Sequence, residues 1–172
     1  MEKDLQIKLV KKAKKGDAHA FVQLCEMYQV VLYNAAYKLL LNDADVADCL
    51  QETEIRAWQK ITNLKNEAAF NTWIFRIMVN HAKDILKKRV AVIEFEERHA
   101  KSEVADYGAP DLNQELSALS EIYRIPLVLY YYAGFSIKEI SEQLKMSTNT
   151  VKTRLMRGRV KLKNLLEEEN NG

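Results

Sequence analysis

The chain has 172 residues and carries 26 Lys and Arg residues against 24 Asp and Glu residues, a net charge of +2. This balance is too small to indicate a nucleic-acid-binding protein from charge alone. A content of 48% hydrophobic and 29% charged residues excludes a disordered chain. No apolar run reaches the roughly 18 residues that span a bilayer, and the N-terminal segment lacks the apolar core of a secretory signal. We therefore expect a cytoplasmic protein with no membrane contact of its own.

The sequence carries no pattern typical of a catalytic centre. Two cysteines are too few for a disulfide framework, and the cysteines and the three histidines show no metal-ligand spacing. No glycine-rich phosphate loop and no nucleophile motif occurs. We expect no metal, no cofactor and no catalytic residue, and we do not expect an enzyme.

The scarcity of helix breakers predicts an all-α fold, because only five Gly and two Pro residues occur in the chain. The charge is distributed unevenly: residues 1–89 hold 15 basic and 11 acidic residues, residues 90–113 hold 2 and 6, and residues 114–172 hold 9 and 7. The acidic stretch has no sustained helical periodicity. It predicts a flexible acidic linker (90–113) between an N-terminal domain (1–89) and a C-terminal domain (114–172).

The N-terminal domain is predicted to contain four helices, which end near Gly16, Asn42, Lys60 and Arg89. Asp17 is the expected N-cap of the second helix and Asn71 that of the fourth. Residues 63–70 are expected to form a loop between the third and the fourth helix.

The C-terminal domain is predicted to end in a helix-turn-helix. A helix capped by Ser120 is expected to stop at Gly134. Ser136 and Glu139 then match the capping box S-x-x-E of a short helix. A turn at residues 145–147 leads into a long basic helix, and this succession of elements is typical of DNA-binding proteins.

The final helix has one apolar and one polar face. Between Lys145 and Lys163 there are seven basic residues and no acidic one. A recognition helix packs one stripe on its domain and offers cations to phosphates and mixed side chains to base edges. The alternative is a basic face that is merely solvated. The apolar stripe contains Val151, Leu155, Gly158, Leu162 and Leu165, and the polar face contains Lys152, Thr153, Met156, Arg157, Arg159 and Lys163.

The fourth and third helices each carry a polar face of another kind. On the fourth, an aromatic ring borders a row of amides and cations, a combination that suits opened single-stranded DNA; the alternative is that the ring belongs to the core. On the third, an acidic face with a central isoleucine suits docking on a basic protein surface. The residues are Trp73, Arg76, Asn80, Lys83 and Lys87 on the fourth helix, and Asp48, Gln51, Glu52, Ile55 and Gln59 on the third.

Three motifs in order resemble the extracytoplasmic-function sigma factors of bacterial RNA polymerase. Residues 45–52 are similar to the family's D-x-x-D-x-x-Q-E signature. Residues 70–84 are similar to its F-x-T-W-L-x-R-I-x-x-N-x-x-x-D helix. Residues 136–155 resemble its helix-turn-helix, with Glu139-Ile140 and T-V-K-T-R-L at 150–155. The resemblance covers nearly the whole chain apart from the predicted linker.

The resemblance implies a role for each face. The third helix would dock on core RNA polymerase, the fourth would hold the promoter minus-ten element, and the final helix would read the minus-thirty-five element. It also implies control by an anti-sigma factor. The implied residues are Asp48, Gln51, Glu52 and Ile55 for polymerase; Trp73, Arg76, Asn80, Lys83 and Lys87 for the minus-ten element; and Ser147, Thr148, Lys152, Thr153, Met156, Arg157 and Arg159 for the minus-thirty-five element.

The chain departs from the family pattern at two informative positions. Lys145 stands where the helix-turn-helix usually has a small residue, which predicts strain or another turn. Pro126 lies inside a predicted helix, where a kink or a broken turn is expected. The alternative function is a helix-turn-helix regulator that acts on duplex DNA without polymerase, and such a protein would not need the acidic face of the third helix.

Overall fold

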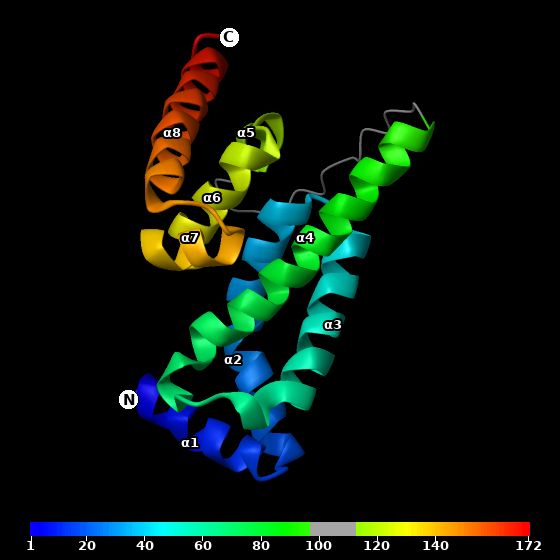
Figure 1. Cartoon of the computed structure of the whole chain (residues 1–172), viewed down its shortest axis with the longest axis vertical. Coiled ribbons are helices and arrows are strands. Elements are labelled where there is room, and N and C mark those ends of the chain that lie inside the picture. The colour runs from blue at the N-terminus through cyan, green and yellow to red at the C-terminus, as the bar shows by residue number, and fades with distance from the viewer. Residues whose placement is uncertain (97–112) are drawn as a thin grey trace.

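The structure, a computed structural model, describes residues 1–96 and 113–172. These residues form helices and no β-strand, which confirms the predicted all-α fold. Two helical domains are visible in Figure 1. The α-helices of the first are α1 (Glu2–Lys14), α2 (Ala18–Leu40), α3 (Asp43–Lys60) and α4 (Phe70–Glu96). Those of the second are α5 (Asn113–Ala118), α6 (Glu121–Tyr131), α7 (Ile137–Leu144) and α8 (Thr148–Asn170).

The starts of α2 and α3 follow from local side-chain caps. The Asp17 carboxylate accepts a hydrogen bond from the Ala20 N–H at 3.0 Å, and the Asn42 amide oxygen accepts one from the Asp45 N–H at 3.0 Å. Each satisfies an N–H that has no partner within its helix. The predicted starts of these two helices are confirmed.

The start of α4 differs from the prediction. Two 3-10 helices, Ile61–Asn63 and Glu67–Ala69, occupy much of the predicted loop, and α4 begins at Phe70. Asn71 therefore lies inside the first turn of α4 and is not its cap. Contacts with α1 hold this segment, since Gln6 Nε2 donates to the Glu67 carbonyl at 3.0 Å and Lys14 Nζ donates to the Leu64 carbonyl at 2.8 Å.

The end of α4 also lies beyond the predicted position. The helix continues past Arg89 to Glu96, so it includes the first residues of the segment that was expected to be a linker. Residues 97–112 of that segment lie outside the described residues. The division into domains at residues 89 and 114 stays a prediction.

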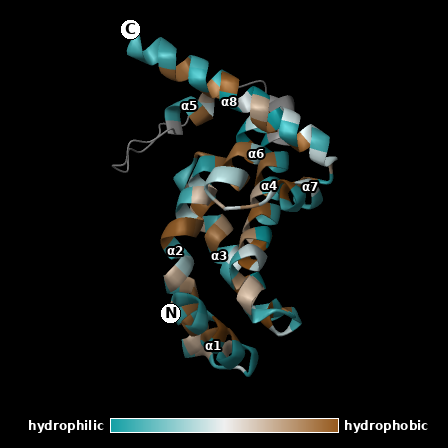
Figure 2. Cartoon of the chain, turned by 90° about the vertical axis from the view of Figure 1, so that its left-hand side faces the viewer, coloured by the Kyte–Doolittle hydropathy of each residue, from teal (hydrophilic) through white to brown (hydrophobic). Residues whose placement is uncertain are grey.

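The N-terminal core forms where α2, α3 and α4 meet. Leu24, Leu40, Val46 and Met78 have no exposed surface, and Phe75 is 1% exposed. Figure 2 shows hydrophobic segments of α2, α4 and α6 in the central part of the molecule. On α3, α4 and α8 the polar and apolar sides that helical periodicity predicted are the exposed and the buried side of the helix.

In the C-terminal domain, α6 and α8 pack closely and α7 lies against both. The glycine of the predicted stripe makes this approach possible, because a Cβ at Gly158 would lie 3.0 Å from Leu127 Cδ1. The expected break at Pro126 is absent, and α6 runs through it. Pro126 has no N–H to donate to the carbonyl of Ile122, which lies in the first turn of α6, so the helix lacks one hydrogen bond there without breaking.

The turn of the helix-turn-helix has the left-handed backbone conformation that glycine usually adopts, although the residue there is Lys145. Lys145 ends α7 with φ 53° and ψ 50°, in the left-handed region that disfavours side chains. The Ser141 hydroxyl donates to the Met146 carbonyl at 2.6 Å, and the Met146 N–H donates to the Ser141 carbonyl at 3.1 Å. These bonds hold the turn in the conformation that Lys145 by itself would avoid.

We expect Ser141→Ala to lower the free energy of unfolding by about 0.5 to 1 kcal/mol, the net value of one half-buried hydrogen bond. Adding Lys145→Gly to that variant should recover most of the loss, since glycine adopts the left-handed region without a steric penalty. Urea unfolding of the single and double variants measures both effects. A double variant less stable than Ser141→Ala would show that Lys145 is not strained.

Candidate binding surfaces

The predicted docking face of α3 is present and open. Asp48, Gln51 and Ile55 are exposed, with Ile55 at 46%, while the opposite face of α3 is buried in the core. Trp58, one turn beyond Ile55, is also 38% exposed and packs on Phe21, with ring centroids 5.1 Å apart. Sequence analysis missed Trp58, which adds an aromatic edge to an otherwise acidic face.

Glu52, the fourth residue of this face, is paired within the helix. Arg56 Nε donates to Glu52 Oε1 at 2.7 Å, and this hydrogen bond lowers the pKa of Glu52 below its ordinary value. The carboxylate is thus held in its charged form on an exposed surface. Arg56 balances the charge of Glu52, and the salt bridge fixes the position of this carboxylate on the α3 face, where a partner's cation can also contact it.

The five predicted minus-ten residues follow one side of α4. Trp73 is half-buried and its ring lies 5.8 Å from that of Phe70, so only part of it is open to a stacking base. Lys87 is exposed, while Arg76 and Lys83 are half-buried. Their partial burial does not come from the N-terminal core alone, because α7 of the other domain lies against this side of α4.

Three side chains of α7 contact the minus-ten face. Gln143 Nε2 donates to Asn80 Oδ1 at 2.7 Å, and Lys83 Nζ donates to the Gln143 carbonyl at 3.4 Å. Arg76 Nη2 lies 3.6 Å from the carboxylate of Glu142 and 3.9 Å from that of Glu139. The sequence contains no local signal for this contact, since α4 and α7 are some sixty residues apart in the chain.

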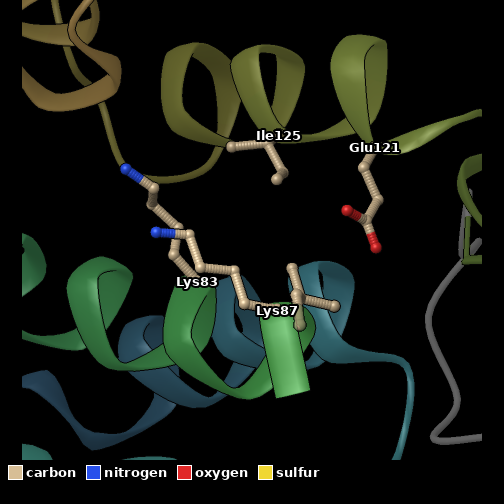
Figure 3. A pocket seen from close by; sticks show the side chains of 5 residues that line it. Lys83, Lys87, Glu121 and Ile125 are labelled. Atoms are coloured by element: carbon tan, nitrogen blue, oxygen red, sulfur yellow. The ribbon is translucent and has the colours of Figure 1, made fainter. Parts of the chain in front are cut away.

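Beside this contact, α4 and α6 enclose a cleft of about 270 Å³ lined by Lys83, Leu86, Lys87, Glu121 and Ile125. Figure 3 shows the ammonium groups of the two lysines at one end of the cleft and Glu121 at the other. Burial lowers the pKa of Lys83, and the charges of Lys87 and Lys145 lower it further. The two lysines of α4 therefore lie together at this end of the cleft.

The predicted minus-thirty-five face lies at the start of α8 and is open. Lys152, Met156 and Arg157 are exposed, while Val151 and Leu155 beneath them are at most 1% exposed. Ser147 caps the helix by accepting a hydrogen bond from the Thr150 N–H at 3.1 Å. Thr148 is exposed and Thr153 is half-buried. The arrangement leaves one helix end and the cations of Lys152 and Arg157 open to solvent, as contact with a DNA groove requires.

Arg159, the last residue of the predicted set, is held against α6. Its Nε donates to the Tyr131 hydroxyl at 2.6 Å, and its guanidinium carbon lies 5.6 Å from the Tyr130 ring centroid and 5.5 Å from that of Tyr131. Sequence analysis missed both tyrosines. The assignment of Arg159 to DNA contact stays a prediction, and its contacts with the two tyrosines favour a role in packing α8 on α6.

The described residues contain no membrane-spanning helix and no group of three His, Cys, Asp or Glu side chains that could hold a metal ion. Burial raises the pKa of Cys49 to about 11, and burial with nearby carboxylates raises that of Cys25 to about 12. Both thiols are protonated at neutral pH, which makes them poor nucleophiles.

Family models match both domains. Residues 24–91 match Sigma-70 region 2, and residues 111–162 match Sigma-70 region 4. The first match contains α3 and most of α4, and the second contains the helix-turn-helix. The regions that carry the three faces are thus the regions that the family models describe.

Curated relatives and solved structures agree with these matches. The chain is 31% identical to the ECF RNA polymerase sigma factor SigW of Bacillus subtilis, over 94% of this chain and 96% of SigW. It is 28% identical to the RNA polymerase sigma factor NccH of Alcaligenes xylosoxydans xylosoxydans, over 92% of this chain and 93% of NccH.

The structure of CnrH in complex with the cytosolic domain of CnrY superposes with a TM-score of 0.70 at 28% identity, covering 95% of this chain and 98% of CnrH. That of the sigma factor RpoE of Bartonella quintana, in complex with the anti-sigma factor NepR, superposes with a TM-score of 0.72 at 25% identity, covering 86% and 96%. The chain belongs to the extracytoplasmic-function (ECF) family of RNA polymerase sigma factors.

Proposed function

We propose that this chain is a dissociable promoter-specificity subunit that acts in the cytoplasm and performs no covalent chemistry. The observation that carries the proposal is the order of three distinct faces, on α3, α4 and α8, within the two regions that match sigma-70 models. Each face has the side chains that one of three partners requires: core polymerase, opened DNA and duplex DNA.

The first step in this proposal is docking through α3. Asp48, Gln51 and Glu52 provide the charge and hydrogen-bonding groups around Ile55, which provides the apolar contact. Charge complementarity of this kind speeds association and excludes wrong partners, while the buried apolar centre slows dissociation. The exposed Ile55 and Trp58 are the residues that a partner surface would cover.

The second step is promoter recognition by both domains. At the start of α8, Lys152 and Arg157 are suited to phosphates and base edges in the major groove. On α4, Arg76, Asn80 and Lys83 are suited to the backbone and bases of an opened strand. Unstacking a base costs a few kcal/mol, and binding of the released bases offsets this cost.

Control by an anti-sigma factor is part of the proposal. The RpoE structure contains the anti-sigma factor NepR, and the CnrH structure contains the cytosolic domain of CnrY. A comparable regulator of this chain would have to cover the α3 face, the DNA-binding faces or both.

The experiment that tests the function is run-off transcription with sigma-free core RNA polymerase and DNA from upstream of the gene for this chain. Specific transcripts that require the protein establish the function and map the promoter. No transcript, together with no association in a pull-down with core polymerase, would exclude it and leave a regulator of duplex DNA as the remaining explanation.

We expect Arg157→Ala to lower transcription from the mapped promoter between fivefold and a hundredfold, because one groove contact contributes about 1–3 kcal/mol. Association with core polymerase should not change, since the α3 face is intact. Run-off transcription and a core-binding assay measure the two quantities. Lys163→Ala is the matched control, because it removes the same charge from α8 roughly 9 Å farther along the helix. An equal loss in both variants would show that only net charge matters.

A further inference from the structure

Gln6 of α1 bonds to the connection between α3 and α4, residues 61–69, which leads directly into the minus-ten face. Its Nε2 donates to the Glu67 carbonyl at 3.0 Å and to the Ala68 carbonyl at 3.4 Å. Its Oε1 accepts a hydrogen bond from the Tyr28 hydroxyl of α2. Gln6 is only 6% exposed, so these bonds are shielded from water. One buried amide therefore joins α1, α2 and the connection.

Lys14, farther along α1, makes a second link to the same connection. Its Nζ donates to the Leu64 carbonyl at 2.8 Å and to Glu67 Oε1 at 3.1 Å. Figure 1 shows α1 beneath the connection, at the lower end of α4. The whole of α1 lies ahead of residues 24–91, the part of the chain that matches Sigma-70 region 2. A helix outside that match thus holds the connection at two places.

A series of aromatic contacts leads from these hydrogen bonds to Trp73 on the minus-ten face. The Tyr28 ring lies 5.6 Å from the Phe70 ring, and the Phe70 ring lies 5.8 Å from the Trp73 ring, measured between centroids. Phe70, the first residue of α4, has no exposed surface. Rings that pack around a fully buried side chain cannot shift independently of one another. A movement of Tyr28 or of the connection therefore changes the orientation of the Trp73 ring.

We propose that Gln6 and Lys14 are positioning residues for the minus-ten element. They hold the connection and, through the intervening aromatic rings, set the orientation of Trp73 before the opened strand arrives. A ring that is already in place loses less conformational freedom when a base stacks on it. Gln6 is buried and Lys14 is bonded to the connection, so neither residue needs to contact the strand. This inference rests on the proposed function, since it assigns a support to the same α4 face.

The first measurement follows the Trp73 ring in the free protein. The chain has two tryptophans, so Trp58→Phe leaves Trp73 as the single indole fluorophore, and this background is used for quenching only. Gln6→Met removes the amide and keeps a side chain of similar length. Gln29→Met, at an exposed position of α2, is the matched control. We expect acrylamide to quench Trp73 more strongly in Gln6→Met than in the parent, and equally in the control and the parent.

The second measurement is fluorescence anisotropy with a single strand that spans the mapped minus-ten element. Gln6→Met and Lys14→Met should each weaken binding about threefold to tenfold, the range that the loss of one hydrogen bond supplies. Lys8→Met, exposed on the same helix, is the matched control for Lys14→Met and should bind as the natural chain does. Association with core polymerase should not change in any variant, whereas unfolding of the N-terminal domain would abolish it. Because Lys14 is half-buried, Lys14→Met still decides the question if Gln6→Met fails to fold.

The salt dependence of strand binding separates positioning from direct contact with a phosphate. A lysine that neutralises one phosphate of a single strand contributes about 0.7 to the slope of log K against log salt concentration. Lys14→Met should leave this slope unchanged. A slope that falls by that amount would overturn the proposal and make Lys14 a DNA contact. Unchanged quenching and strand binding in the Gln6 and Lys14 variants, or equal losses in the controls, would overturn it as well.

Transcription with core polymerase is measured in parallel, so that the two proposals can fail separately. Its absence in every variant and in the natural chain would contradict the proposed function. Quenching of Trp73 in the free protein would still report whether α1 positions this ring.

Discussion

Glu52→Lys is expected to weaken association with core RNA polymerase about a hundredfold. The change places a cation on the α3 face where a negative charge is now held by Arg56, and like charges brought together across an interface are strongly unfavourable. The introduced ammonium group also repels the guanidinium group of Arg56, one turn farther along the helix, in place of the present attraction. A core-binding assay with labelled protein and sigma-free polymerase measures the loss, and transcription should fall with it.

Glu54→Lys provides the matched control for this prediction. It reverses the same charge on the same helix, and Glu54 is exposed on a different side of α3 from Asp48 and Gln51. Binding of duplex minus-thirty-five DNA by the free protein should be unchanged in both variants, since that surface belongs to α8. If both reversals weakened polymerase binding equally, the partner would be responding to net charge and the assigned α3 face would be wrong.

The features that sequence analysis predicted correctly depend on residues close together in the chain. The Ser136 and Glu139 capping box forms as expected, with the Glu139 N–H donating to Ser136 Oγ at 3.1 Å. The buried stripe of α8 was correct at Val151 and Leu155 because helical periodicity alone determines which residues share a face. Caps and periodicity need no knowledge of the tertiary fold.

The features that sequence analysis missed depend on contacts between distant segments. The start of α4 at Phe70 is supported by Gln6 and Lys14 of α1, more than fifty residues away. Lys145 adopts a left-handed conformation that its own side chain disfavours, because hydrogen bonds around the turn outweigh the penalty. A local pattern carries no information on such partners, and for this reason the closure of α7 on α4 could not be predicted.

The candidate site illustrates the same division. The sequence identified which side chains share a polar face on α4, and the structure places Trp73 and Lys87 on that side of the helix. It did not indicate that Gln143 would contact Asn80, or that Arg159 would turn toward Tyr131. Membership of a face is a local property, whereas its accessibility depends on the whole fold.

The second large effect is expected from Gly158→Leu, which should remove between about a third and all of the stability of the C-terminal domain. A Cβ added at this position would lie 3.0 Å from Leu127 Cδ1 and 3.4 Å from Tyr123 Cβ, so the longer side chain of leucine would force α8 away from α6. Overpacking of this kind costs about 3 kcal/mol. A domain of this size has a total stability of only about 3–9 kcal/mol. Thermal unfolding followed by circular dichroism measures the loss.

Gly158→Ala separates overpacking from the mere presence of a side chain. Its methyl group needs only a small shift of the Leu127 side chain, and alanine gains about 1 kcal/mol of helix propensity over glycine, so we expect nearly unchanged stability. Gly158→Leu should lose minus-thirty-five DNA binding while the α3 face still docks on polymerase, whereas Arg157→Ala should lose the same DNA binding with its fold intact. Two adjacent residues of α8 thus distinguish loss of a DNA contact from loss of the domain that presents it. If Gly158→Leu remained as stable as the natural chain, the close packing of α6 on α8 would be wrong, and with it the orientation assigned to the recognition helix.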